Sequence, residues 1–128
     1  MIIDSSAIIA ILLREPGYER LMVAFESARV VGVGAPTLVE TGIVLTARLG
    51  PAGMSILSRF LQESGAVIVP FGPAHWQTAV DAFDRFGKGR HPAALNFGDC
   101  LSYATATMAG QPLLAVGLDF PLTDLQLA

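Results

Sequence analysis

Four acidic side chains in this sequence, Asp4, Glu40, Asp99 and Asp119, have the clearest chemical potential. Asp4 closes a short β-branched run, and Asp119 follows a later apolar run. Glu40 and Asp99 lie within apolar sequence, where an acid is more often a site group than a solvated surface residue. Clustered carboxylates repel one another, and a hard divalent cation such as Mg²⁺ relieves that repulsion. Simpler interpretations also exist, because Asp99 suits a helix cap and Asp119 suits a turn.

Other chemistries find less support. The single cysteine, Cys100, excludes an internal disulfide and a cysteine-built zinc site, and we expect it to be a small core residue. The two histidines lie apart, and neither has a partner at metal-ligand spacing. A phosphatase with Asp4 as nucleophile would need a second aspartate where Ser6 stands. A receiver domain would need a lysine after its last strand, where this chain has none, and the first turn lacks the glycines of a nucleotide-binding loop.

Alternating apolar runs and amphipathic segments must position the four acids. Strands are expected at 1–3, 30–33, 66–69 and 112–116, with a short fifth at 124–127. Helices are expected at 5–13, 18–28, 37–48, 53–63, 73–86 and 98–109. Ser5 or Ser6 is the expected cap of the first helix. In the fifth helix, the side chains expected to pack inward are Trp76, Ala79, Val80 and Phe83. This order predicts an α/β fold with a short, mainly parallel sheet of four to five strands flanked by helices. In such a sheet, strand ends and helix starts meet at one rim, where ligands bind.

Composition limits the class of protein. The 128 residues suit a single domain, residues 1–128, in which 52% of residues are hydrophobic and 15% are charged. That balance excludes a disordered chain, and the longest apolar run, residues 7–13, is far shorter than the ~20 residues of a membrane span. The N-terminus lacks the features of a secretory signal, so the expected location is the cytoplasm. With a net charge of −3, nucleic-acid binding would depend on a local basic patch or on bound cations.

The order of motifs along the chain resembles the PIN-domain nucleases, specifically the VapC-type toxins of bacterial toxin–antitoxin pairs. The resemblance covers essentially the whole chain and rests on residues 1–7 (MIIDSSA), 40–41 (ET), 96–100 (NFGDC) and 117–124 (GLDFPLTD). It implies a PIN-like fold and an acidic quartet made of Asp4, Glu40, Asp99 and Asp119, with the Ser6 hydroxyl near the metal. Leu118 stands where relatives often carry an acidic or polar residue, so Asp124 stays an alternative fourth acid.

The same resemblance implies an endoribonuclease that depends on Mg²⁺, with Mn²⁺ as a substitute. Asp4 and Asp99 would bind the metal directly. Glu40 would bind it or orient the attacking water, and Asp119 would hold a second metal or a metal-bound water. The implied partners are RNA, a cognate VapB-type antitoxin and a second copy of the chain, in a heterotetramer or larger complex. The alternative is a PIN scaffold that cleaves little and mainly binds RNA or protein.

Two further segments concern these partners. Apolar residues of the first two expected helices exceed what one thin core layer needs, and the resemblance implies that an antitoxin segment binds in a groove that they form. The alternative is that all of them are ordinary core residues. They include Ile8, Ile9, Leu12, Leu13, Leu21 and Phe25. Arg85, Lys88 and Arg90 lie within six positions beside a Gly- and Pro-containing loop that leads toward Asp99. We expect this basic loop to hold the phosphates of RNA, the alternative being a solvated loop that only aids solubility.

Overall fold

Four short parallel strands form the centre of the computed structural model, which describes residues 1–128. They are β1 (Ile2–Ile3), β2 (Gly32–Gly34), β3 (Val67–Val69) and β4 (Leu113–Leu114). Their order across the sheet is β3-β2-β1-β4, and Ile2 of β1 pairs with Gly32 on one side and Leu113 on the other. Because all strands run in the same direction, their carboxyl ends meet at one rim of the sheet.

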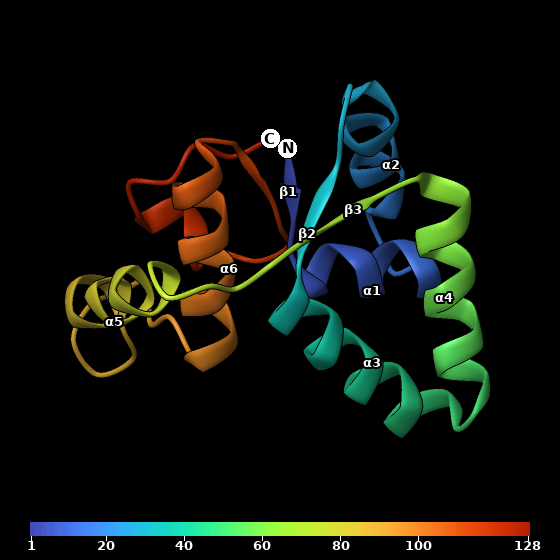
Figure 1. Cartoon of the computed structure of the whole chain (residues 1–128), viewed down its shortest axis with the longest axis horizontal. Coiled ribbons are helices and arrows are strands. Elements are labelled where there is room, and N and C mark those ends of the chain that lie inside the picture. The colour runs from blue at the N-terminus through green and yellow to red at the C-terminus, as the bar shows by residue number, and fades with distance from the viewer.

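Six α-helices cover the two faces of the sheet (Figure 1). On one face lie α5 (His75–Phe86) and α6 (Phe97–Ala109). On the other lie α1 (Ser5–Leu13), α2 (Tyr18–Ser27), α3 (Ala35–Leu49) and α4 (Ala52–Ser64). A 3-10 turn over Phe120–Leu122 follows β4. No helix is both long enough and apolar enough to cross a membrane.

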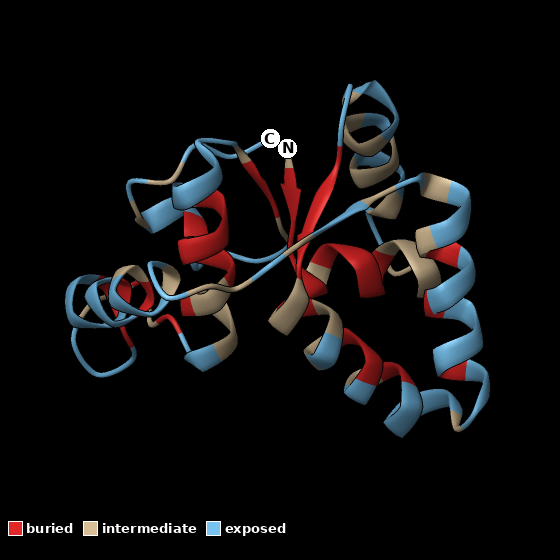
Figure 2. Cartoon of the chain, viewed as in Figure 1, coloured by how far each residue is buried: buried red, intermediate tan, exposed pale blue.

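Adjacent side chains of β1 enter two different hydrophobic cores, because side chains alternate between the faces of a strand. Ile2 packs in a cluster with residues of α5 and α6, including Ala82 and Tyr103. Ile3, which is fully buried, packs in a second cluster with residues of α1, α3 and α4, including Leu45. Figure 2 shows these buried segments gathered around the sheet and along the inward faces of the helices. The central strands therefore lie between two packed layers.

The predicted α/β architecture with a parallel sheet is confirmed, and three local predictions are wrong. The fifth strand is absent: Leu127 forms only one isolated bridge to Leu113, so the sheet has four strands. The cap of α1 is neither Ser5 nor Ser6, because the Asp4 carboxylate accepts the Ser6 backbone N–H instead. An aspartate at the end of β1 can therefore cap the helix that follows it.

The inward face of α5 also differs from the prediction. Ala79 is buried as expected, but Trp76, Val80 and Phe83 are exposed, and the other inward residues are Ala82 and Phe86. The helix carries two apolar stripes, so periodicity does not say which stripe faces the protein. The stripe with the two alanines faces inward, because small side chains let α5 approach α6 closely.

Candidate active site

Asp4 lies at the carboxyl end of β1 and is buried, with 3% of its surface exposed. Its Oδ2 accepts two hydrogen bonds from Ser6, one from the backbone N–H at 2.9 Å and one from the hydroxyl at 2.6 Å. Its Oδ1 accepts a third, from the Ser102 hydroxyl on α6, at 2.6 Å. These three donors compensate the cost of burying a carboxylate. Ser6, expected near the site, thus contacts Asp4 directly.

Glu40 projects from the second turn of α3 toward the start of α6. Its Oε1 accepts a hydrogen bond from the Ser5 hydroxyl, which follows Asp4 in the chain. Its Oε2 lies so close to Gly98 that any Cβ at this position would overlap it. Gly98 precedes Asp99, so this contact brings the carboxyl group of Glu40 to the segment that carries Asp99.

Asp99 occupies the first turn of α6, where it takes part in a capping box with Asn96. The Asp99 carboxylate accepts the Asn96 backbone N–H at 2.9 Å, and the Asn96 side chain accepts the Asp99 N–H at 2.9 Å. Burial raises the pKa of Asp99 to about 6, an effect reduced by the hydrogen bond from Asn96 and increased by the charges of Asp4, Asp119 and Glu40. Asp99 is therefore a capping residue and also the acid whose pKa is affected by the charges of the other three.

Asp119 and Asp124, the two alternatives for the fourth acid, lie in different surroundings. Asp119 is exposed, forms no ion pair and contributes to the negative field at Asp99. Asp124 instead accepts hydrogen bonds from the Tyr103 hydroxyl at 2.6 Å and from Arg85 at 2.5 Å. These two hydrogen bonds, that from Tyr103 being the stronger cause, lower the pKa of Asp124. Of the two acids, Asp119 is the one whose charge contributes to the raised pKa of Asp99.

The donor set of this acidic quartet (Asp4, Glu40, Asp99, Asp119) fits a hard cation. All its donors are carboxylate oxygens, and hydroxyl groups surround them, which is the chemistry that Mg²⁺ prefers. Burial is the main cause of the raised pKa of Asp99, and the charges of Asp4, Asp119 and Glu40 add a smaller repulsion that a cation would relieve. The carboxylates do not form a finished cage, however, because no three Asp, Glu, His or Cys side chains converge closely enough to hold an ion. Three of the four are turned toward internal donors instead.

The basic loop carries less free positive charge than its sequence indicates. Arg85 bonds Asp124 and also contacts Asp81, and Arg90 pairs with Asp84 at 2.8 Å. Lys88 forms no ion pair and is exposed. Of the three basic residues, Lys88 is therefore the one whose charge is not offset by a neighbouring carboxylate.

Sequence reasoning missed two buried hydroxyl residues behind the quartet. Ser102 on α6 bonds Asp4, and Thr37 on α3 lies 3.2 Å from Ser102 between their hydroxyl oxygens. A usable signal existed, because Ser102 lies three residues after Asp99 and Thr37 three residues before Glu40. That spacing places each hydroxyl on the same helix face as an acid.

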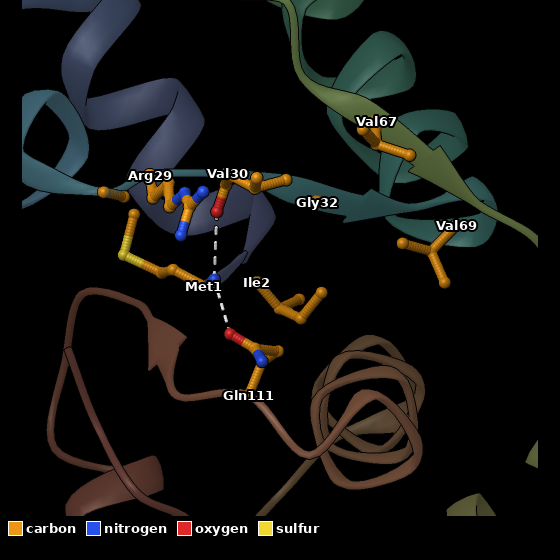
Figure 3. Close-up of a pocket in the computed structure, with 9 residues that line it drawn as sticks. Met1, Ile2, Arg29, Val30, Gly32, Val67, Val69 and Gln111 are labelled. Atoms are coloured by element: carbon orange, nitrogen blue, oxygen red, sulfur yellow. Dashed lines mark hydrogen bonds between the residues drawn. The ribbon is translucent and has the colours of Figure 1, made fainter.

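Two cavities lie at opposite ends of the sheet. One, of about 550 Å³, adjoins the acidic quartet and is lined by Glu40, Gly98 and apolar residues that include Phe97, whose surface is 81% exposed. The other, of about 510 Å³, lies at the amino ends of the strands (Figure 3). There the Met1 ammonium donates to the Val30 carbonyl at 3.0 Å and to Gln111 Oε1 at 2.9 Å. No carboxylate lines this second cavity.

Comparison with known proteins gives a family match over nearly the whole chain. Residues 1–124 match the PIN domain. The chain is 48% identical to Ribonuclease VapC36 of Mycobacterium tuberculosis, over 98% of this chain and 91% of that protein. It is 42% identical to Ribonuclease VapC of Mycolicibacterium smegmatis, over 97% of this chain and 96% of that protein.

Solved structures show the same fold at low sequence identity. VapC20 of Mycobacterium tuberculosis, a sarcin–ricin loop cleaving toxin, superimposes with a TM-score of 0.78 and 17% identity, covering 97% of this chain and 95% of that one. VapBC2 of Rickettsia felis, bound to a DNA fragment from their promoter, gives 0.76 and 14%, covering 99% and 96%. The family match and the identity to curated relatives extend over nearly the whole length. The chain therefore belongs to the PIN-domain family, within the group of the VapC ribonucleases.

Proposed function

We propose that this chain is a Mg²⁺-dependent endoribonuclease, with Mn²⁺ as a substitute, that acts in the cytoplasm as the toxin of a VapBC-type toxin–antitoxin pair. One PIN domain, residues 1–128, would carry the activity. The observation that carries the proposal is the position of Glu40, whose carboxyl group lies against Gly98 beside Asp99. In agreement with this, the charges of Asp4, Asp119 and Glu40 add to the burial that raises the pKa of Asp99 to about 6. The support from relatives is the 48% identity to a protein named as a ribonuclease.

In this proposal Asp4 and Asp99 bind the cation directly. Glu40 binds it or orients the attacking water, and Asp119, exposed at the rim, holds a second ion or its water. When bound, Mg²⁺ would neutralise the charge of the scissile phosphate and lower the pKa of a coordinated water. Ser6 fixes the Asp4 carboxylate through two hydrogen bonds. Ser5 does the same for Glu40 through one.

No side chain at the site is suited to act as a nucleophile. Cys100 is the nearest candidate by sequence, but it is buried, with 4% of its surface exposed. Burial, and to a smaller extent the charge of Asp99, raise the pKa of the Cys100 thiol to about 11. A thiol with that pKa is protonated at neutral pH and is a poor nucleophile. Hydrolysis by an activated water is the chemistry that the carboxylates support.

The substrate is held in part by the basic loop. Lys88 contributes a free charge, whereas Arg85 and Arg90 must first exchange a carboxylate partner for a phosphate. We therefore assign the larger share of phosphate binding to Lys88 and a smaller share to Arg90 and Arg85. With one unpaired cation in this loop, RNA binding by the loop would be weak unless divalent cations also contribute.

The antitoxin would bind in a groove different from the predicted one. Ile8 and Ile9 of α1 are buried in the core, so they are not available to a partner, and the remaining predicted residues are partly buried against that core. The exposed apolar groove lies instead between α3 and α4, with a volume of about 680 Å³. Its lining includes Val39, Ile43 and Met54, each more than half exposed.

A second copy of the chain would cover the exposed apolar side chains next to the acidic quartet. These are Phe97 at the start of α6 and Val80 and Phe83 on α5. Pairing through this surface would place two acidic sites next to each other. Substitution of Phe97 by Glu should convert a dimer to a monomer in analytical ultracentrifugation, and an unchanged sedimentation coefficient would remove this surface from the dimer.

The test of the proposed function is RNA cleavage by the purified protein, freed of antitoxin. We expect cleavage with Mg²⁺, none with excess EDTA, and recovery when Mg²⁺ is restored. Mapping the 5′ ends of cut RNA would identify the sites. Binding of RNA without cleavage under any divalent cation would favour the alternative, a catalytically weak PIN module, to which the open arrangement of the carboxylates is suited.

A further inference from the structure

A chain of three buried polar side chains runs behind the acidic quartet. The Ser102 hydroxyl lies 2.6 Å from Asp4 Oδ1 and 3.2 Å from the Thr37 hydroxyl. Only 1% of Ser102, 4% of Thr37 and 3% of Asp4 is exposed. These groups are therefore shielded from bulk solvent, and Ser102 links the other two by hydrogen bonds.

The direction of the hydrogen bonds follows from proton counting. An ionised carboxylate only accepts, so the single hydroxyl proton of Ser102 is donated to Asp4. Ser102 then accepts at its oxygen, and Thr37 is the donor of the second hydrogen bond. The three side chains therefore form a hydrogen-bond relay from Thr37 through Ser102 to Asp4. In this relay, each hydroxyl proton points toward the carboxylate.

The relay acts on the oxygen of Asp4 that remains available. A carboxylate has about four lone-pair directions, two on each oxygen. Both directions of Oδ2 are taken by the two donors of Ser6. Oδ1 accepts one hydrogen bond, from Ser102, and keeps one direction free. The atom that Ser102 orients is thus the atom with a lone pair left for a ligand.

The relay also joins the three elements that carry buried or half-buried acids of the quartet. Thr37 lies on α3 one turn before Glu40, and Ser102 lies on α6 one turn after Asp99. Asp4 ends β1. A hydrogen-bonded path from α3 through α6 to β1 therefore sets the relative positions of Glu40, Asp99 and Asp4.

We propose that Ser102, supported by Thr37, is a positioning residue that holds Asp4 Oδ1 ready for the divalent cation. The inference rests on the proposed function, since it concerns the cation of that same site. Ser102 touches neither substrate nor ion and acts only through Asp4. Hydrogen-bond partners of a metal ligand typically contribute ten- to a hundredfold to metal affinity.

In the experiment, the purified wild-type protein and its variants are titrated with Mn²⁺. Binding is measured by isothermal titration calorimetry and by the loss of the free Mn²⁺ signal in electron paramagnetic resonance. Ser102→Ala should raise the Kd for Mn²⁺ about tenfold. The matched control is Thr105→Val, because Thr105 is equally buried on the same helix and its hydroxyl bonds only the Leu101 carbonyl. This control should keep the Kd within about twofold, even if its thermal stability falls.

A double-mutant cycle tests the path itself. Thr37→Val should raise the Kd a few-fold in the wild-type background and leave it unchanged in the Ser102→Ala background, because Thr37 acts through Ser102. If Ser102→Ala does not fold, Ser102→Cys replaces it, since cysteine nearly keeps the volume and is only a weak donor. An unchanged Kd in the folded Ser102 variant, or an equal rise in Thr105→Val, would overturn the proposal.

Asp4→Asn separates this inference from the proposed function. Loss of Mn²⁺ binding in Asp4→Asn together with normal binding in Ser102→Ala would overturn only the relay. Normal Mn²⁺ binding in Asp4→Asn would show that Asp4 does not bind the cation, and this result would overturn both proposals.

Discussion

The two ends of the parallel sheet have opposite chemistry, although each has a cavity of similar size. At the carboxyl end, the acidic quartet gathers beside a cavity of about 550 Å³. At the amino end, a cavity of about 510 Å³ is lined mainly by aliphatic side chains, and its charged groups are the Met1 ammonium and Arg29 (Figure 3). The volumes of the two cavities therefore do not distinguish a reactive site from a structural hollow.

The difference arises from the direction of the chain. The helices α1, α3 and α6 all begin at the carboxyl end of the sheet, where their N-termini favour negative side chains. Asp4 caps one of these helices, and Asp99 lies in the first turn of another. At the amino end the chain enters strands from loops, so aliphatic strand residues such as Ile2 and Val67 line the cavity. Parallel topology thus concentrates acids at one rim.

The largest effect should come from removing an acid at the carboxyl end. Asp4→Asn or Asp99→Asn should lower RNA cleavage by about a hundredfold or more, because each removes a charge that stabilises the reacting phosphate through the cation. The matched change at the amino end, Gln111→Ala, should leave cleavage within about twofold. Gel-based cleavage assays of the three variants make the comparison.

Stability should separate loss of chemistry from loss of fold in these variants. Burial and neighbouring charges raise the pKa of Asp99 to about 6, so its ionised form opposes folding at neutral pH. Metal-free Asp99→Asn should therefore melt at the same temperature as the wild type or higher. If Asp99→Asn unfolds at assay temperature, or cleaves normally in Mg²⁺, the contrast between the two ends does not hold.

A pair of glycines sharpens the comparison. Ala at position 98 would displace the flexible carboxyl end of Glu40, so Gly98→Ala should reduce cleavage about tenfold while the melting temperature stays equal or rises slightly. Ala at position 32 would press on Ile2 at 2.9 Å and on Val69 at 3.1 Å. Gly32→Ala should thus destabilise the fold by about 1 kcal/mol and leave Mn²⁺ affinity unchanged. Both variants are compared by calorimetry and by cleavage assays. A loss of stability in Gly98→Ala with normal cleavage, or a loss of Mn²⁺ affinity in Gly32→Ala with normal stability, would contradict the comparison.

Asp124 provides a smaller test of which acids belong to the site. Its pKa is lowered by Tyr103 and Arg85, so its ionised form stabilises the fold above the ordinary aspartate pKa, and this stabilisation disappears as pH falls through the lowered value. Asp124→Asn should unfold at lower urea concentration than the wild type at neutral pH. That difference should vanish in strong acid, where the wild-type carboxyl is also protonated. Unchanged Mn²⁺ affinity would keep Asp124 outside the site, and a weaker affinity would return it as the fourth acid.

The smallest effect concerns the basic loop. Lys88→Ala with Arg90→Ala should weaken RNA binding in a nuclease-inactive background and reduce the salt slope by about 0.7 for each phosphate that the protein no longer neutralises. Arg29→Ala with Arg59→Ala is the control, since it removes two charges from the amino end and from α4. An equal change of slope in both double variants would show a general charge effect and no role for the loop.

The sequence by itself predicted the order of strands and helices and singled out the candidate acids, with Asp119 and Asp124 as alternatives for the fourth. Period-two and helical patterns are local properties, and they predict the parallel α/β arrangement that the sheet order β3-β2-β1-β4 displays. Acids within apolar sequence, such as Glu40 and Asp99, stand out because burying a charge is costly unless it serves a site or is paired.

Only the tertiary structure decided which groups touch. It separated Asp119 from Asp124, because Arg85 and Tyr103 come to Asp124 from α5 and α6. It placed the exposed apolar groove between α3 and α4, since the apolar side chains of α1 are packed in the core. It also brought Ser102 to Asp4 across 98 positions of sequence. Contacts between distant segments depend on how whole helices pack, and no local pattern records that packing.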